Sequence, residues 1–382
     1  MRIAFDISPA AENVKTGIGF YITNIIEELK NNYTNNEYLF NLMCFRNRKK
    51  KVENLSSLIN SSNCHLQIQT GNISIYRNLS QVFPIPYSFL FKKKADVHHF
   101  WNYFLPLGVP RKKIVTVYDM VYMACPETMY KNNKYTLDFT VKRSCRRADS
   151  IVTISEFSKN EIIKYLDIDP KKISVIPCGI DTRLFFPINE DDVITSVKRK
   201  FNIQGDYFLY LGTLEPRKNL VRLIQAYKIV KQRYPDSPKL VLAGKPGWLY
   251  EGIFIEIDKQ KLNNEIINLD YVSNENRNPL ICGATGFLFP SLYEGFGMPP
   301  LEAMACGIPV LTSNVSSLPE VVGDAAIKVD PLNVEEIANG IEHLFLDNET
   351  RKILSSKGLK RTQYFSWEKS AHKLMKLYED IV

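Results

Sequence analysis

The segment that decides the fold runs from Thr285 to Cys306 and reads TGFLFPSLYEGFGMPPLEAMAC. It begins as a short apolar strand, turns at Gly295 and Gly297, and continues as a helix that starts near two prolines. Proline suits the first turn of a helix because its fixed φ already matches. A strand, a tight turn and a helix form one unit of a parallel sheet, and such sheets bind ligands at the carboxyl ends of their strands. The segment therefore predicts an α/β fold with a ligand site in its turn.

The same alternation extends along the whole chain. Helices are predicted at 19–30, 133–147, 156–166, 220–233, 301–306 and 334–346. Strands are predicted from the apolar runs at 2–8, 38–45, 64–69, 95–100, 113–119, 150–155, 172–177, 206–212, 239–244, 266–272, 285–291 and 308–313. Strands that alternate with helices indicate parallel sheets covered on both faces.

Chain length favours two domains rather than one, since 382 residues exceed the usual size of a single core. The stretch CGIDTRLFFPINEDD at 178–192 interrupts the alternation, so the boundary is placed near Phe186. We expect two doubly wound, Rossmann-like domains, residues 1–186 and 187–363, that face a cleft.

Composition narrows the class of protein. Apolar residues make up 45% and charged residues 24%, which is typical of a globular protein. The seven cysteines are scattered and include no Cys-x-x-Cys pair, which argues against a disulfide framework or a zinc site and favours a reducing cytosol. The first residues lack the order of a signal peptide, and no apolar run reaches the length of a membrane span.

Charge is distributed unevenly between the two halves. Residues 1–186 hold 26 of the 49 Lys and Arg but 16 of the 41 Asp and Glu, a net +10, and the remainder is −2. Single clusters, at 46–51, 92–94, 111–113 and 142–147, are each better explained as solvated loops and helix ends. A whole basic half instead indicates an anionic partner, which is a nucleic acid, a membrane surface or a phosphorylated acceptor. The apolar tract 82–91 beside Lys92–Lys94 is read as loop or core with a secondary role in membrane contact.

Two glutamates flank the glycine turn, Glu294 before it and Glu302 in what we expect to be the first helical turn. Each alone reads as a helix cap. Together with the N–H groups of residues 295–298, they describe a site where amides hold phosphate and carboxylates accept hydrogen bonds from hydroxyls. A sugar nucleotide has that chemistry, with its ribose diol, diphosphate and sugar hydroxyls.

A second motif, LYLGTLEPRKNL at 209–220, runs from a strand into a helix. Arg217 and Lys218 are expected in the connecting loop. Alone the pair reads as a solvated helix start, but beside a phosphate site it would neutralise a diphosphate leaving group.

These motifs resemble the retaining, metal-independent glycosyltransferases of the GT-B fold, in the large family of bacterial mannosyl-, glucosyl- and rhamnosyltransferases (group 1, family-four type). The resemblance covers essentially the whole chain. Its central blocks are EGFGMPPLE at 294–302 and GTLEPRKN at 212–219. Further blocks in matching order are TGIGFY at 16–21, VYDMVYMACPE at 117–127, ISEFSK at 154–159, VIPCGID at 175–181 and LPEVVGDAA at 318–326. The last segment, 364–382, is similar to the final helix that in this family returns to the first domain.

The resemblance implies roles for particular residues. Glu302 would hold the ribose hydroxyls of the donor, Glu294 the hydroxyls of the transferred sugar, and Arg217 and Lys218 the diphosphate. The remaining donor-binding residues would be Gly17, Gly19, Gly295, Phe296 and Gly297. Catalysis would depend on Tyr118, Asp119, Lys218 and Glu294, with no cofactor and no metal. The two N-terminal glycines are not a dinucleotide fingerprint, because Ile22 stands where its third glycine would be.

The sequence departs from the family pattern at Tyr118, where members commonly carry histidine, and at Phe20, where arginine is common. The tyrosine at position 118 can form a hydrogen bond but, unlike histidine, it cannot hold a positive charge. His99 falls where relatives often have a histidine near the cleft, although a histidine at a strand end is more often packed in the core.

The resemblance favours an enzyme that moves a hexose, in the first place mannose from GDP-mannose, or a deoxyhexose to a glycan or lipid-linked acceptor in polysaccharide or O-antigen synthesis. It would work in the cytoplasm, peripherally at the inner face of the membrane. The alternatives are a non-catalytic nucleotide-sugar-binding homologue or subunit, a hydrolysing epimerase, and a nucleic-acid-binding protein. The last is weakest because no recognition motif accompanies the basic charge, so no nucleic acid partner is expected.

Overall fold

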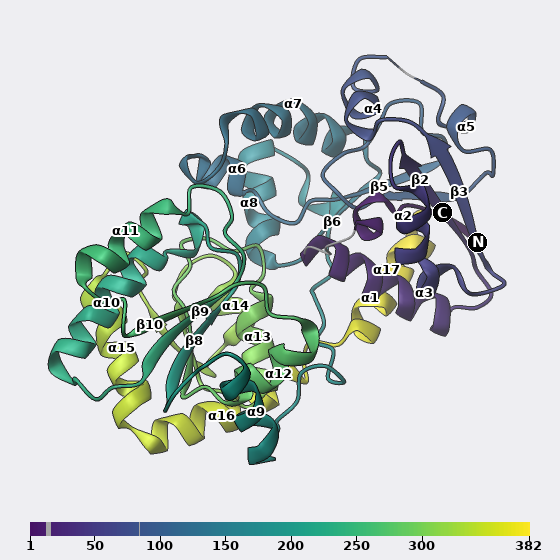
Figure 1. Ribbon diagram of the computed structural model, residues 1–382. Coiled ribbons are helices and arrows are strands. Elements are labelled where there is room, and N and C mark those ends of the chain that lie inside the picture. The colour runs from purple at the N-terminus through teal and green to yellow at the C-terminus, as the bar shows by residue number, and fades with distance from the viewer. Residues whose placement is uncertain (13–16, 84) are drawn as a thin grey trace. The chain divides into compact units, whose positions relative to one another are not determined.

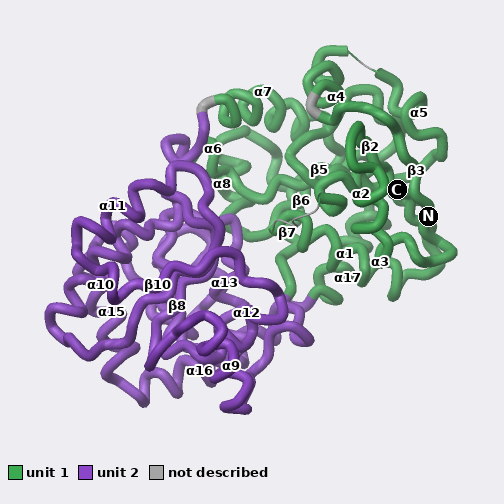
Figure 2. Tube along the Cα trace, viewed as in Figure 1, with its two compact units in different colours: residues 1–124, 131–179, 367–382 green, residues 125–130, 180–366 purple. Residues whose placement is uncertain are grey.

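The computed structural model describes residues 1–12, 17–83 and 85–382, and its helices and strands are labelled in Figure 1. The chain forms two compact units (Figure 2). Unit 1 comprises residues 1–124, 131–179 and 367–382, and unit 2 comprises residues 125–130 and 180–366. The main crossing between the units therefore falls between Gly179 and Ile180. The sequence predicted this boundary slightly later in the chain, near Phe186.

Unit 1 is built on a seven-stranded sheet in the order β3-β2-β1-β4-β5-β6-β7, with every strand pair parallel. The strands are β1 (Arg2–Asp6), β2 (Glu37–Cys44), β3 (Cys64–Thr70), β4 (Val97–Phe100), β5 (Lys112–Thr116), β6 (Ser150–Thr153) and β7 (Ile173–Val175). The α-helices of this unit are α1 (Gly17–Asn32), α2 (Arg48–Asn54), α3 (Ser56–Ile59), α4 (Ile73–Leu79), α5 (Tyr87–Leu90), α6 (Val121–Ala124), α7 (Lys131–Arg147), α8 (Glu156–Leu166) and α17 (Trp367–Ile381).

Unit 2 is built on a six-stranded parallel sheet in the order β10-β9-β8-β11-β12-β13. The strands are β8 (Tyr207–Leu211), β9 (Lys239–Ala243), β10 (Ile266–Leu269), β11 (Gly286–Phe289), β12 (Val310–Ser313) and β13 (Ala326–Val329). The α-helices are α9 (Asp191–Lys200), α10 (Leu220–Arg233), α11 (Glu251–Gln260), α12 (Asn274–Cys282), α13 (Met298–Ala305), α14 (Leu318–Val322), α15 (Val334–Leu346) and α16 (Asn348–Thr362). Both sheets are doubly wound, so the predicted fold class of two Rossmann-like domains is confirmed.

The last helix, α17, belongs to unit 1 although it follows unit 2 in the chain. It packs against α1, and its Tyr378 is fully buried. The Tyr378 hydroxyl hydrogen-bonds to Nδ1 of His99 at 2.6 Å, and the His99 ring stacks on Trp101 with 3.7 Å between centroids. A fully apolar aromatic core thus gains a polar contact that fixes the position of the helix.

Local sequence signals explain several helix boundaries. Ser155 caps α8, because its hydroxyl accepts a hydrogen bond from the backbone N–H of Ser158, as the preference for serine at this position predicts. Predicted bounds agree with the structure for α8, α10 and α15. Strand β13, the short helices α2 to α6 and the helices α9, α11, α12, α14 and α16 were not predicted.

The structure also tests what the sequence predicted for its apolar segments. Among the described residues, no helix combines the length and apolarity needed to cross a lipid bilayer. The tract 82–91 divides between core and surface: Tyr87 and Phe91 are buried, whereas Val82, Phe83 and Phe89 are exposed.

Candidate functional site

The two motifs of unit 2 meet because β8 and β11 are neighbours in the sheet. One motif follows the carboxyl end of β8 and the other follows the carboxyl end of β11, and these ends lie at the same edge of a parallel sheet. The N–H of Leu292 donates to the carbonyl of Arg217 at 2.9 Å, which ties the two loops together. Arg217 and Lys218 lie in a short 3-10 turn, Pro216–Lys218, rather than in an irregular loop.

A buried cluster of four charges forms at this edge, which we call the charge cluster: Glu215, Arg217, Lys218 and Glu294. Nζ of Lys218 lies 2.6 Å from Oε1 of Glu294, and Nη1 of Arg217 lies 2.9 Å from its Oε2. Nη2 of Arg217 also contacts Oε1 of Glu215 at 2.6 Å. The exposed fractions of Glu215, Lys218 and Glu294 are 2%, 8% and 7%. Two cations and two carboxylates therefore balance one another out of water, as buried charges require.

Electrostatics inside the charge cluster favour the ionised carboxylate. Burial alone would raise the pKa of Glu294, but the positive charges of Arg217 and Lys218 outweigh it and hold the pKa at about 2. Burial lowers the pKa of Lys218, and the neighbouring Arg217 lowers it further, while Glu294 and Glu215 offset part of that effect. The sequence predicted both cations and Glu294 but assigned no role to Glu215.

The loop that carries Glu294 is held by two serines that the sequence analysis missed. The backbone N–H of Glu294 donates to Oγ of Ser316 at 3.1 Å. The hydroxyl of Ser317 donates to the carbonyls of Glu294 and Phe296 at 2.8 and 2.9 Å. These bonds fix the backbone beside the carboxylate.

Gly297 makes the turn into α13 possible. Its φ of +109° is one that other residues rarely adopt, and a Cβ there would lie 2.7 Å from Cδ2 of Leu318. The first turn of α13 contains Pro299 and Pro300, which have no N–H, so the backbone amides that this turn offers are those of residues 295–298.

Glu302 lies in the second turn of α13 rather than the first, and it caps nothing. It is 6% exposed and pairs with Arg277 of α12, with 2.5 Å between Oε2 and Nη2. Burial raises the pKa of Glu302, and Arg277 offsets only part of that rise. Arg277 also lies over the ring of Phe185 at 5.2 Å, and its buried Nε has no hydrogen-bond partner among the described residues. The sequence did not predict Arg277, which lies in no motif.

The predicted residues of unit 1 fall in two places. Gly17 is the first residue of α1, with open space where a side chain would be, and Gly19, two residues further on, is buried. Residues 13–16, including the first threonine of TGIGFY, lie outside the described residues.

Tyr118 and Asp119 follow the carboxyl end of β5. Tyr118 is 5% exposed, and its ring packs edge-on against Tyr21 and Tyr103 at 5.6 and 5.9 Å. Its buried hydroxyl has no hydrogen-bond partner among the described residues, and burial raises its pKa well above the usual value. Oδ1 of Asp119 accepts hydrogen bonds from Tyr103 and from the N–H of Val121.

His99 lies in the core of unit 1. Besides Tyr378 it contacts Oγ1 of Thr116 at 2.8 Å, and burial lowers its pKa well below the usual value. Both ring nitrogens are therefore used inside the core, which is the packing role that the sequence analysis preferred.

No cluster of three or more His, Cys, Asp or Glu side chains with metal-site geometry occurs in the described part of the chain. The one Asp-x-Asp triplet, Asp167 to Asp169, has a local role: Asp167 ends α8, and Asp169 accepts from the N–H of Lys171.

Solved structures share this fold over the whole chain. Sucrose-phosphate synthase from Thermosynechococcus elongatus has a TM-score of 0.78 and 18% identity, and the match covers 100% of this chain and 98% of that one. WaaG, a glycosyltransferase involved in lipopolysaccharide biosynthesis, has a TM-score of 0.72 and 14% identity, covering 100% and 99%. At these identities the likeness establishes the fold, and two parallel-sheet units of this kind define the GT-B class of glycosyltransferases.

Sequence comparison gives the family. Residues 17–184 match the model of Glycosyltransferase Family 4, and residues 194–361 match that of Glycosyl transferases group 1. The chain is 32% identical to O-antigen chain mannosyltransferase B of Escherichia coli, covering 99% of this chain and 100% of that protein. It is 28% identical to O-antigen chain mannosyltransferase RfbU of Salmonella typhimurium, covering 61% of each. This chain belongs to the group 1 glycosyltransferases.

Proposed function

We propose that the chain is a retaining, metal-independent hexosyltransferase that uses no cofactor and takes mannose from GDP-mannose. The acceptor would be a glycan or a lipid-linked glycan in polysaccharide or O-antigen synthesis. The observation that carries the proposal is the charge cluster, where Lys218 and Arg217 hold Glu294 at the carboxyl ends of β8 and β11. The choice of mannose is supported by the names of the relatives.

The charge cluster would act by exchanging partners. Without a donor, both cations are neutralised by carboxylates, so a diphosphate gains from them only if Glu294 turns away. Glu294 would then accept hydrogen bonds from the sugar hydroxyls, while Lys218 and Arg217 bind the diphosphate. As the glycosidic bond breaks, these preorganised cations stabilise the charge that develops on the leaving diphosphate.

The Arg277–Glu302 pair would bind the other end of the donor. Oε2 of Glu302 contacts Arg277, which leaves Oε1 as the acceptor for a ribose hydroxyl. Hydrogen bonds to charged groups contribute about 1.5–3 kcal/mol each, so this carboxylate is expected to contribute to nucleotide affinity. Tyr118, with its unpartnered hydroxyl, would donate to the transferred sugar.

A panel of GDP-, UDP-, dTDP- and ADP-sugars in a thermal-shift assay tests the donor. A ligand at 100 times its dissociation constant stabilises by about 2.7 kcal/mol, so the preferred donor raises the melting temperature measurably. We expect GDP-mannose to give the largest shift and Lys218→Ala to reduce it, while Lys352→Ala, a surface lysine of α16, leaves it unchanged. No shift with any sugar nucleotide would contradict the proposal.

A non-catalytic nucleotide-sugar binder is the second candidate, and Tyr118 favours it because the family commonly has histidine there. Transfer of labelled sugar to lipid-linked acceptors separates the two. A donor that binds and is neither transferred nor hydrolysed would support the second candidate.

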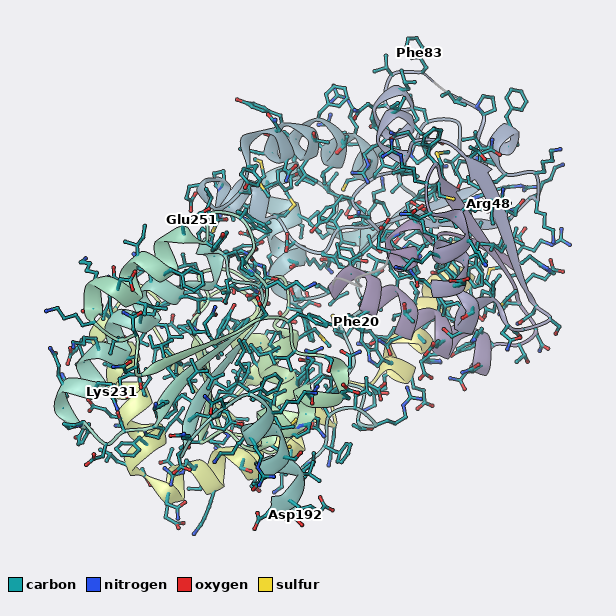
Figure 3. All side chains as sticks on the ribbon, in the orientation of Figure 1. Phe20, Arg48, Phe83, Asp192, Lys231 and Glu251 are labelled. Atoms are coloured by element: carbon teal, nitrogen blue, oxygen red, sulfur yellow. The ribbon has the colours of Figure 1, made fainter. Side chains whose placement is uncertain are left out.

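Unit 1 carries a surface that fits an anionic bilayer. Val82, Phe83 and Phe89 are exposed by 60%, 61% and 77%, and Phe83 projects from the edge of the molecule (Figure 3). Lys92–Lys94, close by in the chain, are also exposed. We infer peripheral binding to the membrane that holds a lipid-linked acceptor, since each basic residue near an anionic surface contributes about 1 kcal/mol.

Vesicle co-sedimentation tests this surface. Vesicles that contain phosphatidylglycerol should retain the protein at low salt, and neutral vesicles should not, because salt screens the attraction. Replacing Lys92, Lys93 and Lys94 by glutamine should release it. The matched control replaces Lys352, Lys357 and Lys360 of α16 and should bind as the wild type does; equal loss in both would show only a general charge effect.

A further inference from the structure

Helices α12 and α13 each end in a cysteine, and the two thiols share one acceptor. Cys282 is the last residue of α12 and Cys306 follows the last residue of α13. Sγ of Cys306 lies 2.9 Å from Oδ1 of Asn278, and Sγ of Cys282 lies 3.6 Å from the same oxygen. The two sulfurs are therefore no more than 6.5 Å apart, the limit set by those two distances. A disulfide needs sulfurs about 2.05 Å apart, so the two side chains and the helix ends that carry them must move towards each other to form one.

The two thiols differ in exposure and acidity. Cys282 is half-buried, whereas Cys306 is 3% exposed. The neighbouring Cys306 lowers the pKa of the Cys282 thiol and the backbone N–H of Ile188 lowers it further, which outweighs the opposite effect of burial. Burial raises the pKa of Cys306 well above its usual value. Because the thiolate is the reactive form, Cys282 is the sulfur that reacts first with a soluble oxidant.

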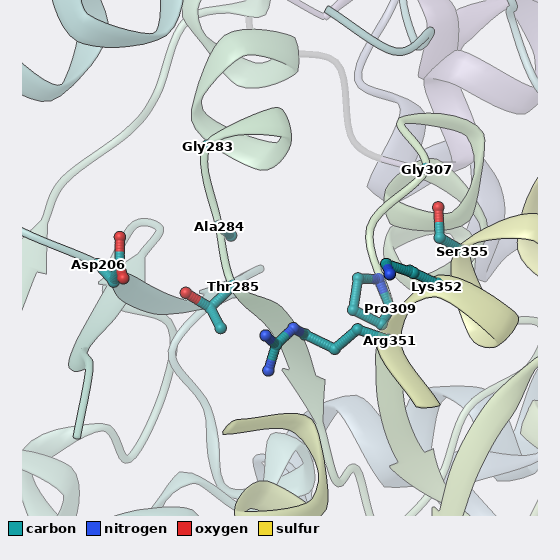
Figure 4. A pocket seen from close by; sticks show the side chains of 9 residues that line it. All are labelled: Asp206, Gly283, Ala284, Thr285, Gly307, Pro309, Arg351, Lys352 and Ser355. Atoms are coloured by element: carbon teal, nitrogen blue, oxygen red, sulfur yellow. The ribbon is translucent and has the colours of Figure 1, made fainter. Parts of the chain in front are cut away.

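A surface hollow of about 390 Å³ lies beside the residues that follow the two cysteines in the chain. Its lining includes Gly283 and Gly307, which directly follow Cys282 and Cys306 (Figure 4). The hollow lies at the amino-terminal edge of the strands, since Thr285 and Pro309 in its lining precede β11 and β12. It is therefore separate from the charge cluster at the opposite edge, and small molecules reach the backbone beside the thiols from this side.

The same two helices carry the Arg277–Glu302 pair. Arg277 lies five residues before Cys282 on α12, and Glu302 lies four residues before Cys306 on α13. The backbone N–H of Cys306 donates to the carbonyl of Glu302 at 3.1 Å, so the cysteine continues the helical turn that positions the glutamate. A covalent bond between the sulfurs would pull on the ends of the helices whose other residues form the ion pair.

We propose that Cys282 and Cys306 form an oxidisable dithiol pair that hydroperoxides convert to a disulfide. The Cys282 thiolate attacks one oxygen of hydrogen peroxide, forming a sulfenic acid and releasing hydroxide, which takes up the proton lost from Cys282. The Cys306 sulfur then attacks the Cys282 sulfur, the S–O bond breaks, and the hydroxyl leaves as water with the Cys306 proton. In total two thiols lose two hydrogens and one peroxide becomes two waters.

Oxidation also acts on the neighbouring ion pair, a consequence that rests on the proposed donor role of Glu302. Drawing the sulfurs to bonding distance shifts α12 against α13 and changes the contact between Arg277 and Glu302. We expect the affinity for free GDP to fall at least about fivefold on oxidation and to return after treatment with dithiothreitol. A fivefold change is the lower end of the range that is usual for coupling between two sites.

Peptide mass spectrometry after treatment with hydrogen peroxide tests the bond without any donor. In the wild type, a cross-linked pair of peptides containing Cys282 and Cys306, lighter by two hydrogens, should appear and vanish on reduction. Cys282→Ser and Cys306→Ser should not form it, and Cys125→Ser, the other half-buried cysteine, should form it normally. A wild type in which Cys282 is oxidised to sulfinic acid with no cross-link would overturn the proposal.

Binding of GDP to the reduced and oxidised proteins tests the consequence separately. If the cross-link forms and GDP affinity is unchanged, the coupling to Glu302 is wrong while the dithiol pair stands. If no nucleotide binds even to the reduced protein, the proposed function fails while the cross-link result is untouched. Far-UV circular dichroism confirms that each serine variant is folded before either measurement.

Discussion

The charge cluster of unit 2 and the aromatic cluster of unit 1, formed by Tyr118, Tyr21 and Tyr103, differ in how they satisfy their polar groups. In the charge cluster, Arg217 and Lys218 are fully paired with Glu215 and Glu294. In the aromatic cluster, the buried Tyr118 hydroxyl has no partner among the described residues. A ligand that binds at the charge cluster must displace a carboxylate from the cations. A ligand that binds at Tyr118 gives the hydroxyl a partner and displaces none.

This difference predicts separate effects on stability and catalysis. Removing one member of a buried ion pair leaves an uncompensated charge and costs about 3–5 kcal/mol, so substitutions in the charge cluster should weaken both the fold and the reaction. Removing a buried hydroxyl that has no hydrogen-bond partner leaves no other polar group unsatisfied. Substitutions at Tyr118 should therefore affect the reaction and not the stability of the fold.

The largest effect is expected from Lys218→Ala. If Lys218 neutralises the leaving diphosphate, turnover should fall about 10²–10³-fold, as it does when one stabilising donor of a developing negative charge is lost. Steady-state transfer at saturating donor measures it, with thermal unfolding to confirm that the variant is folded at the assay temperature. Lys352→Ala is the control on an exposed helix. A folded variant with near wild-type turnover would remove Lys218 from the site.

The second effect concerns acid stability and isolates Glu294. Its pKa lies at about 2 in the folded protein, below the ordinary value of 4.5. A carboxyl whose pKa is depressed by folding stabilises the protein above its unfolded pKa, and that stabilisation is lost as the pH falls towards the folded value. Each pKa unit corresponds to about 1.4 kcal/mol, so on the order of 3 kcal/mol should be lost between about pH 4.5 and 2.

Urea unfolding of wild type and Glu294→Gln across this pH window measures the difference. The gap in unfolding free energy between the two should shrink as the pH falls, because the glutamine has no charge to lose. A gap that stays constant from pH 7 to the acid limit would show that the Glu294 carboxylate is not stabilised by its two cations.

A smaller effect is expected from Glu302→Ala, and it should appear in binding. Loss of one charged hydrogen bond of about 1.5–3 kcal/mol corresponds to an affinity for free GDP weaker by about ten- to 150-fold. Isothermal titration with GDP measures it directly. Glu302→Gln, which keeps an acceptor oxygen, should recover part of the affinity. Unchanged affinity in both variants would contradict the ribose assignment.

Much of the fold follows from the sequence, because buried parallel strands are continuous apolar runs that are easy to recognise. The predicted bounds of α8 agree with the structure, in which Ser155 caps the first turn of the helix. Strand β13 was missed because it is only four residues long and its third residue, Lys328, is charged and exposed, so it lacks a continuous apolar pattern. Helix α12 was missed because its sequence, NENRNPLIC, contains a proline and reads as a loop.

The site was predicted only as far as its motifs extend. Glu294, Arg217 and Lys218 stand in recognisable blocks, so their approach could be inferred from two neighbouring βα turns. Arg277 stands in no block, and its pairing with Glu302 depends on how α12 packs against α13, which local sequence does not encode. The sequence also did not predict that both cations form ion pairs with carboxylates. The sequence shows which residue types are present, but the packing of the two loops determines which of them become partners.

The smallest effect is expected at Tyr118, where this chain departs from its family. Burial raises the pKa of the Tyr118 hydroxyl, so it stays neutral and can only donate a hydrogen bond to the sugar. Tyr118→Phe should leave the melting temperature unchanged or slightly higher and slow transfer by up to about tenfold, the value of one neutral hydrogen bond. Tyr118→His should shift preference among sugars that share one nucleotide, including those without a 6-hydroxyl. Rates of transfer from GDP-mannose and GDP-deoxyhexoses measure both. If the wild type is inactive and the histidine variant gains activity, Tyr118 marks a non-catalytic site; an active wild type indifferent to both changes would show that the hydroxyl does not contact the sugar.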